Sequence, residues 1–256
     1  MIFKKHHIAL LLPALMIVGC TTQKTAPQAT KPVRQGNVQV TQTITVKPVV
    51  RPTVVTPAPK PSYSSFSDWK SNFSMRAVAA GKNPSDIQRL LASANLNQQV
   101  ISLDSSQPEF SKMPWDYADS AVSGGRVSTG QRKFNEQRSY LSGLESRYGV
   151  PAEIIASIWG MESSFGAVTG NSYIPSSLAS LAYDGRRQKF AEDQLLALAE
   201  LLQRGDISWS QLDGSWAGGM GETQFIPDTW LKYGVDGDYN GHRNPWATAD
   251  ALASTA

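Results

Sequence analysis

The sequence predicts a mainly α-helical protein preceded by a long N-terminal segment without a core. Apolar residues recur at intervals of three and four along much of residues 63–256, whereas alternating strand patterns are scarce and no internal repeat is found. At 256 residues, the chain can form one large domain or two small ones, with enough core for an enzyme.

The composition argues against nucleic-acid binding. The formal net charge is only +3, and much of the positive charge lies in the N-terminal region. Tryptophan and tyrosine are abundant, with seven and eight residues. Flat aromatic rings are common in sugar sites, although most of these residues are expected to pack in the core.

Residues 1–20 have the features of a secretion signal. Lys4 and Lys5 provide a basic start, residues 8–18 form the apolar stretch, and Gly19 and Cys20 follow. The apolar stretch is too short to span a bilayer comfortably as a permanent helix. We therefore expect this segment to be cleaved after secretion, with Cys20 as the new N-terminus.

Cys20 is the only cysteine, so neither a disulfide framework nor a cysteine-based zinc site is available. The sequence Ile17–Cys20 resembles a bacterial lipobox with isoleucine where leucine is usual, which favours a lipid anchor over a nucleophile at Cys20. By resemblance to such lipoproteins, Thr21 implies sorting to the outer membrane, on its periplasmic face.

Residues 21–62 are predicted to be a disordered tether. They are rich in threonine, proline, valine, lysine and glutamine, a composition that cannot bury a core. The folded part is expected to cover residues 63–256, with a helical lobe over about 63–148 and a core over about 149–256.

Helical spacing predicts the first elements of the folded part. One helix carries Phe66, Trp69, Phe73 and Ala77. The next begins at Asn83–Pro84, an N-cap and a first-turn proline, and carries Ile87, Leu90, Leu91 and Ala94. A third is expected to carry Phe134, Leu141, Leu144 and Tyr148, and a fourth covers residues 190–202.

Between the third and fourth of these helices, residues 151–166 predict one that carries an unusual glutamate. Pro151 suits its first position and Gly166 its C-terminal stop. At 100° per residue, Glu162 falls on one stripe with Ile155, Ile158 and Phe165, beside Ile154 and Met161.

An apolar setting of this kind would raise the pKa of the Glu162 carboxyl, as a general acid near neutral pH requires. The alternative is a partly exposed glutamate, or one paired with an arginine.

Four segments together resemble the membrane-bound lytic murein transglycosylase B family. They are Gln107–Phe110, Gly149–Ile155, Ile158–Gly166 and Ser215–Pro227, in this order. The resemblance covers residues 66–256 and implies an α+β lysozyme-like core with a helical lobe, which cleaves the glycan strands of peptidoglycan.

The resemblance implies that Glu162 is the sole catalytic carboxylate. It would protonate the oxygen that links N-acetylmuramic acid to N-acetylglucosamine, while the muramic acid's own N-acetyl group stabilises the charge at C1. The ionised Glu162 would then accept the proton of the 6-hydroxyl of the same sugar, which attacks C1 and leaves a 1,6-anhydro end. Ordinary glycosidases need a second carboxylate.

The glycine-rich segment Ser215–Phe225 is the second part of the candidate site. Its glycines allow close approach of the backbone to a ligand. By the resemblance, Ser215 and Gln224 line the sugar site; the alternative is a structural turn that caps a helix. Glu222 is a further carboxylate here, either a second catalytic group or, in better agreement with the family, a surface residue.

Asp236-Gly-Asp-Tyr-Asn-Gly-His242 resembles the start of an EF-hand loop, with oxygen donors at positions 1, 3 and 5 and glycine at position 6. Ala247 stands at position 12, where glutamate is usual, so Asp250 would close a longer loop of the kind found in the family. The predicted ligands are Asp236, Asp238, Asn240, Asp250 and the backbone carbonyl of His242. A structural Ca²⁺ competes with a simple turn as the explanation.

Residues 250–256 predict the start of an alanine-rich helix with no stop signal. Because family members continue beyond this point, we expect that the C-terminal part is missing. Three functions follow: a lytic transglycosylase, a lysozyme-type hydrolase that pairs Glu162 with Glu222 or Asp184, or a non-catalytic glycan-binding lipoprotein. No cofactor is expected for catalysis, and cell-wall synthesis enzymes are candidate partners.

Overall fold

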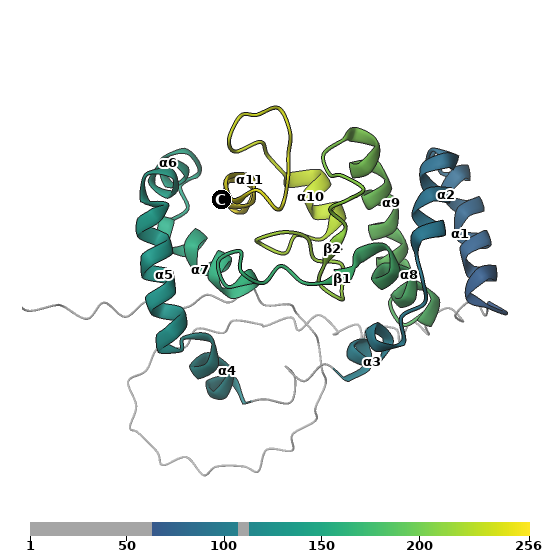
Figure 1. Cartoon of the computed structure of the whole chain (residues 1–256), viewed down its shortest axis with the longest axis horizontal. Helices are drawn as coiled ribbons and strands as arrows, with labels where there is room; N and C mark the ends of the chain where they lie inside the picture. The colour runs from purple at the N-terminus through teal and green to yellow at the C-terminus, as the bar shows by residue number, and fades with distance from the viewer. Residues whose placement is uncertain (1–62, 107–112) are drawn as a thin grey trace, which may run out of the picture. The chain divides into compact units, whose positions relative to one another are not determined.

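Helices make up nearly all the regular structure of residues 63–106 and 113–256, the part that the computed structural model describes (Figure 1). In chain order, the elements are α1 (Phe66–Ala79), α2 (Pro84–Ser93), α3 (Gln98–Ser106), α4 (Pro114–Ala121), α5 (Gly124–Glu136), α6 (Arg138–Tyr148), α7 (Ala152–Ser163), β1 (Ser172–Tyr173), α8 (Ile174–Asp184), α9 (Gln188–Arg204), β2 (Asp213–Gly214), α10 (Pro227–Tyr233) and α11 (Thr248–Thr255). The mainly helical class is confirmed.

Several predictions fall outside the described residues. These are the signal segment, the lipidation site at Cys20, the tether over residues 21–62 and the segment Gln107–Phe110. Within the described part, no helix combines the length and the apolar character needed to cross a bilayer.

The first two predicted helices form for the reasons that their sequences suggest. Trp69, Phe73 and Ala77 point into the core from α1. The Asn83 side chain accepts hydrogen bonds from the backbone N–H of Ser85 (2.9 Å) and Asp86 (3.4 Å), and so caps α2 as predicted. Helices α9 and α11 also occupy the regions where apolar or alanine-rich patterns predicted them.

The helix predicted from Phe134 to Tyr148 is two helices. The helix is interrupted at Gln137. Phe134 therefore lies in the last turn of α5, while Leu141 and Leu144 are buried residues of α6. The apolar spacing continues across the break, which is why the pattern alone did not reveal it.

Two hydrophobic clusters hold the described part together, and each combines residues from before and after position 149. In the first, α1 and α2 pack with α8 and α9 (Figure 1). Helices α8 and α9 contact each other more extensively than any other two helices of the described part. In the second, α7 packs with α5, α6 and α11. The predicted lobe and core are therefore joined by shared apolar packing within one unit.

The only strands in the described residues are β1 and β2, of two residues each, paired antiparallel with Ser172 opposite Gly214 and Tyr173 opposite Asp213. This pair joins the segment that follows α7 to the segment that leads into the glycine-rich loop. It thus brings together two stretches on which the candidate site depends.

Candidate active site

A cavity of about 410 Å³ brings Glu162, Ser215 and Gln224 together. Glu162 comes from the last turn of α7, whereas Ser215 and Gln224 come from the two ends of the glycine-rich loop. The three residues named from sequence as a catalytic acid and its sugar-binding neighbours therefore line one concave surface.

The predicted position of Glu162 on the buried face of its helix is wrong. The buried residues of α7 are Ala152, Ile155, Ala156, Trp159, Gly160 and Ser163. Ile158 and Met161, which were placed with Glu162 on the buried stripe, are 37% and 43% exposed, and Glu162 is exposed as well. Because α7 is apolar on nearly all sides, its hydrophobic spacing does not identify the face that the protein covers.

The Glu162 carboxyl nevertheless has a raised pKa, caused by loss of hydration. Solvent reaches the outer part of this side chain, but the walls of the cavity replace much of the water that would surround it in the open. The concave setting rather than full burial accounts for the direction of the shift. That direction agrees with the sequence-based expectation.

The ring of Phe165 packs against the C-terminal end of α7. The helix ends at Ser163, not at Gly166, and both Ser164 (φ 51°) and Phe165 (φ 63°) take left-handed backbone conformations. Such values are unusual for a bulky residue. The Phe165 ring packs edge-on against Trp159, with 5.5 Å between centroids, and its tip occupies the space above Gly160 where a Cβ would lie 2.4 Å away.

Hydrogen bonds within the glycine-rich loop orient the other two site residues. The Ser215 hydroxyl oxygen accepts from the backbone N–H of Gly219 at 2.7 Å. The Gln224 side-chain amide donates to the backbone oxygens of Thr169 (3.0 Å) and Gly221 (2.7 Å). Gln224 also has a positive φ of 54°, so the loop turns sharply there. Both side chains are positioned before any substrate binds.

A further cavity wall comes from α3, which the sequence reasoning missed. Gln99, Val100 and Leu103 of α3, with Asn97 just before it, form this wall. Asn171 and Trp216 line the cavity from other segments. The backbone N–H of Asn97 donates to the Ser180 hydroxyl of α8 at 2.8 Å, so this wall is tied to the larger hydrophobic cluster. Trp216 belongs to a segment singled out from sequence, whereas α3 has too weak an apolar pattern to reveal it.

The two other carboxylates considered for catalysis do not line the cavity. Glu222 is half-buried rather than a surface residue, and its carboxylate accepts hydrogen bonds from Trp159 Nε1 and Thr248 Oγ1, each at 2.8 Å. Asp184 is exposed at the end of α8. Of the described residues that line the cavity, Glu162 is the one with a carboxylate.

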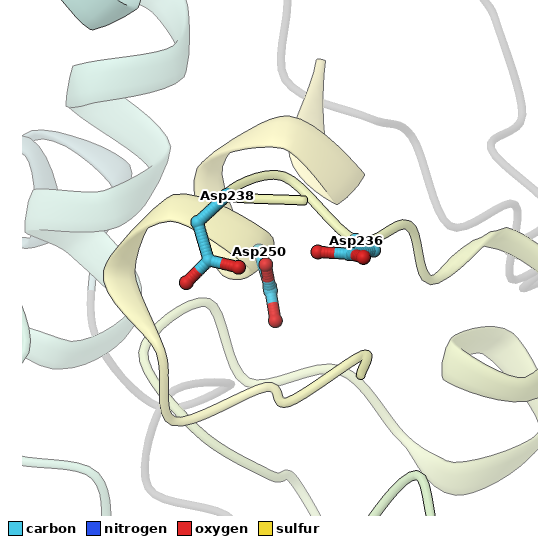
Figure 2. Close-up of side chains that lie close together, drawn as sticks. All are labelled: Asp236, Asp238 and Asp250. Atoms are coloured by element: carbon cyan, nitrogen blue, oxygen red, sulfur yellow. The ribbon is translucent and has the colours of Figure 1, made fainter. Parts of the chain in front are cut away.

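The predicted metal loop also brings carboxylates together. Asp236, Asp238 and Asp250 each offer an oxygen within 4.8 Å of the others (Figure 2). Asn240 lies beside them, with its amide donating to Asp238 Oδ2 at 3.0 Å, and the exposed His242 donates its backbone N–H to Asn240 Oδ1 at 2.9 Å.

Asp250 is the buried anchor of this loop. Its two oxygens accept from the backbone N–H groups of Gly237 (2.7 Å) and Asn244 (2.8 Å). Nearby, the Tyr140 hydroxyl lies within hydrogen-bond distance of the Gly237 and Ala249 carbonyls; burial, with the Asp250 charge, raises the pKa of Tyr140 to about 12. An all-oxygen set of this kind fits a hard cation such as Ca²⁺.

A family model described as "Transglycosylase SLT domain" matches residues 65–256. The chain belongs to this family. Among curated relatives, membrane-bound lytic murein transglycosylase B of Escherichia coli (strain K12) is 31% identical over 186 residues, which cover 69% of this chain and 52% of the relative. The chain thus spans about half the length of the curated relative that it matches.

Solved structures of the family agree. SltB3 from Pseudomonas aeruginosa, in complex with NAG-NAM-pentapeptide, has a TM-score of 0.71 and 43% identity, covering 75% of this chain and 52% of SltB3. Escherichia coli Slt35, in complex with calcium, has a TM-score of 0.66 and 29% identity, covering 72% and 60%. These likenesses confirm the lysozyme-like, mainly helical architecture.

Proposed function

We propose that this chain is a peptidoglycan lytic transglycosylase that cleaves the MurNAc-β-1,4-GlcNAc bond without water and leaves 1,6-anhydroMurNAc ends. One observation carries the proposal. Glu162, whose pKa is raised, lies in a cavity together with Ser215 and Gln224. A carboxyl group of this kind can donate a proton near neutral pH and take one back later.

In the proposed reaction, Glu162 first protonates the glycosidic oxygen as the bond to C1 breaks. The substrate's N-acetyl group stabilises the positive charge at C1. The ionised Glu162 then accepts the proton of the 6-hydroxyl group as that oxygen attacks C1. Because the nucleophile belongs to the same sugar, its attack gains from proximity and needs no activated water.

Among the described residues that line the cavity, Glu162 has no partner carboxylate, which favours this route over hydrolysis. A glycosidase of the ordinary kind places two carboxyl groups across the scissile bond. Here Glu222 is bonded to Trp159 and Thr248, and Asp184 is exposed at the end of α8. Neither contributes to the lining of the cavity that holds Glu162.

Ser215 and Gln224 are proposed to bind the sugar beside the reacting bond. Because the Ser215 oxygen already accepts from the Gly219 N–H, its own hydrogen is available for a sugar oxygen or for the Glu162 carboxylate. The side-chain NH₂ group of Gln224 donates both of its hydrogen bonds to backbone oxygens. The side-chain carbonyl oxygen of Gln224 therefore stays available to accept a hydrogen bond from a sugar hydroxyl. SltB3 has also been solved in complex with NAG-anhNAM-pentapeptide, which supports an anhydro product for this family.

The proposal includes a lipid anchor at Cys20 that holds the protein at the periplasmic face of the outer membrane. The Lys4–Cys20 pattern and the description of the Escherichia coli relative as membrane-bound support this location. Glycan strands of peptidoglycan are the proposed substrate, and cell-wall synthesis enzymes are proposed partners.

We further propose that Asp236, Asp238, Asn240, Asp250 and the carbonyl of His242 hold a structural Ca²⁺. The convergence of the three aspartate side chains supports the site, as does the calcium complex of Slt35. The ion would neutralise carboxylates that otherwise repel one another, and would take no part in the reaction.

The test is digestion of purified sacculi, with the products weighed by mass spectrometry. We expect anhydro ends from the parent and a loss of rate of at least about 100-fold in Glu162→Gln, which keeps the shape but removes the acid. Glu145→Gln, an exposed change on α6, is the matched control. Reducing ends, heavier by one water, would instead indicate a hydrolase; binding without release would indicate a non-catalytic lipoprotein.

A further inference from the structure

The Glu222 carboxylate lies outside the cavity but connects the elements that form it. Trp159, on α7 one turn before the catalytic glutamate, donates its indole N–H to Glu222 Oε2 at 2.8 Å. Thr248, at the start of α11, donates its hydroxyl to Glu222 Oε1 at 2.8 Å. Glu222 itself belongs to the glycine-rich loop, two residues before Gln224. One side chain therefore joins α7, α11 and the loop.

The main chain of Glu222 reinforces this connection. Its carbonyl oxygen accepts a hydrogen bond from the hydroxyl of Ser163, the residue that follows Glu162. The same Ser163 oxygen accepts from the backbone N–H of Gly166 at 2.8 Å, while the N–H of Glu222 donates to the Pro245 carbonyl at 2.9 Å. Glu162 thus lies in a helical turn that is bonded to Glu222 on both sides, through Trp159 and Ser163.

We propose that Glu222 is a positioning residue, which sets the separation of Glu162 from Ser215 and Gln224 without touching the substrate. The inference rests on the proposed function. Because Glu222 and Gln224 share one short loop, the hydrogen bonds that hold Glu222 to α7 also hold Gln224 opposite Glu162. A displacement of about 1 Å in such a site costs on the order of 100-fold in rate.

Two substitutions separate positioning from acid–base chemistry. In Glu222→Gln, the amide oxygen still accepts from Trp159 Nε1, and the amide nitrogen donates to Thr248 Oγ1 with the hydroxyl as acceptor. In Glu222→Ala, both partners lose their acceptor and the connection is broken. A milder change, Thr248→Val, removes one of the two side-chain contacts and leaves the other.

The experiment measures kcat, KM and the pH profile of glycan-strand cleavage for the parent, these three variants, Glu162→Gln and the control Glu145→Ala. We expect Glu222→Ala to lower kcat about 100-fold, with KM and the alkaline limb of the profile close to those of the parent. Glu222→Gln should restore most of kcat, and Thr248→Val should lie between. A parent-like kcat in Glu222→Ala overturns the inference, and so does a Glu222→Gln enzyme as slow as Glu162→Gln, because that result would make Glu222 a catalytic group.

A second readout does not depend on turnover. The indole N–H signal of Trp159 in NMR should lie downfield in the parent and in Glu222→Gln, where it donates to an acceptor, and should move upfield in Glu222→Ala. An unmoved signal would show that the Trp159–Glu222 bond is not formed in solution and would refute the inference. A parent that releases no anhydro product refutes the proposed function instead, while this signal still tests the connection.

Discussion

At the scale of single residues, the chemistry depends on where Glu162 stands on a helix that is apolar on nearly every side. The sequence identified the residue and the direction of its pKa shift, but not its exposed position. Ile158, one turn earlier, was expected beside it on the buried face and is 37% exposed. Tertiary packing decides which side of such a helix is covered, because more than one stripe has enough apolar residues to serve as the buried one.

The raised pKa predicts a pH dependence for the reaction. The first step needs the protonated carboxyl, so the rate falls as pH rises through the pKa of Glu162. Ile158→Lys would place a cation one helical turn from Glu162 and favour its ionised form, and we expect the alkaline limb of kcat/KM to move down by about 0.2–0.4 pH unit. Ile158→Gln is the uncharged control and should move the limb less. An alkaline limb that stays in place in Ile158→Lys would exclude Glu162 as the titrating acid.

The same shift has a consequence for stability. A carboxyl whose pKa is raised by folding binds its proton more tightly in the folded state, so its ionisation destabilises the fold as pH rises above the ordinary value of 4.5. Glu162→Gln should therefore stabilise the protein at neutral pH by less than about 1 kcal/mol, because solvent reaches the side chain and weakens the effect. Thermal unfolding of both proteins at pH 4 and pH 8 checks this; an equal gain at both values would contradict it.

At the scale of elements, the end of α7 shows how packing replaces a sequence signal. Gly166 was the expected stop, yet the helix ends three residues earlier, where Ser164 and Phe165 adopt left-handed conformations that their side chains disfavour. The Phe165 ring offsets this cost by filling the space above Gly160, on the helix that it terminates. A sequence pattern shows Gly160 and Phe165 as residues, but it does not show that the Phe165 ring packs against Gly160.

This packing predicts an unusual result for Gly160→Ala. Alanine normally stabilises a helix interior relative to glycine, but here its Cβ would lie 2.4 Å from the tip of Phe165. We expect the free energy of unfolding to fall by about 1–3 kcal/mol, together with the cleavage rate, because Phe165 must move and the end of α7 moves with it. Denaturant unfolding and glycan cleavage measure the two effects.

Gly143→Ala is the matched control, since nothing lies within 4 Å of the added Cβ on α6. It should raise the free energy of unfolding by about 0.5–1 kcal/mol. The double variant Gly160→Ala/Phe165→Leu should lose less than the sum of its single changes, because leucine relieves the overlap. Additive losses would mean that the ring and the glycine are not coupled.

At the scale of the whole described molecule, the sequence predicted helices well and their partners poorly. Local spacing and caps located α1, α2 and α9, but no local pattern indicates that α1 and α2 pack against α8 and α9, or that α7 packs against α11. The break between α5 and α6 was missed because the apolar spacing continues across it, and the cavity wall from α3 because it depends on contacts with α8. The prediction that Ser215 and Gln224 share a site with Glu162 came from the resemblance to a known family and not from periodicity.

The loop between α10 and α11 offers a prediction at this scale, because Asp250 joins the loop to a helix that packs on α7. If Ca²⁺ binds with the dissociation constant of about 0.1–1 mM typical of extracellular modules, about 10 mM Ca²⁺ should add about 1.4–2.7 kcal/mol to the free energy of unfolding. The melting temperature should rise accordingly over that in EDTA, whereas Mg²⁺, which keeps its waters and needs a smaller octahedral site, should have little effect. Asp238→Asn, a change at an exposed ligand, should reduce the gain from Ca²⁺. Because it also removes one of three mutually repelling carboxylates, it should leave the melting temperature in EDTA at or slightly above that of the parent. Equal melting temperatures of the parent in Ca²⁺ and EDTA would show that the three carboxylates form only a turn.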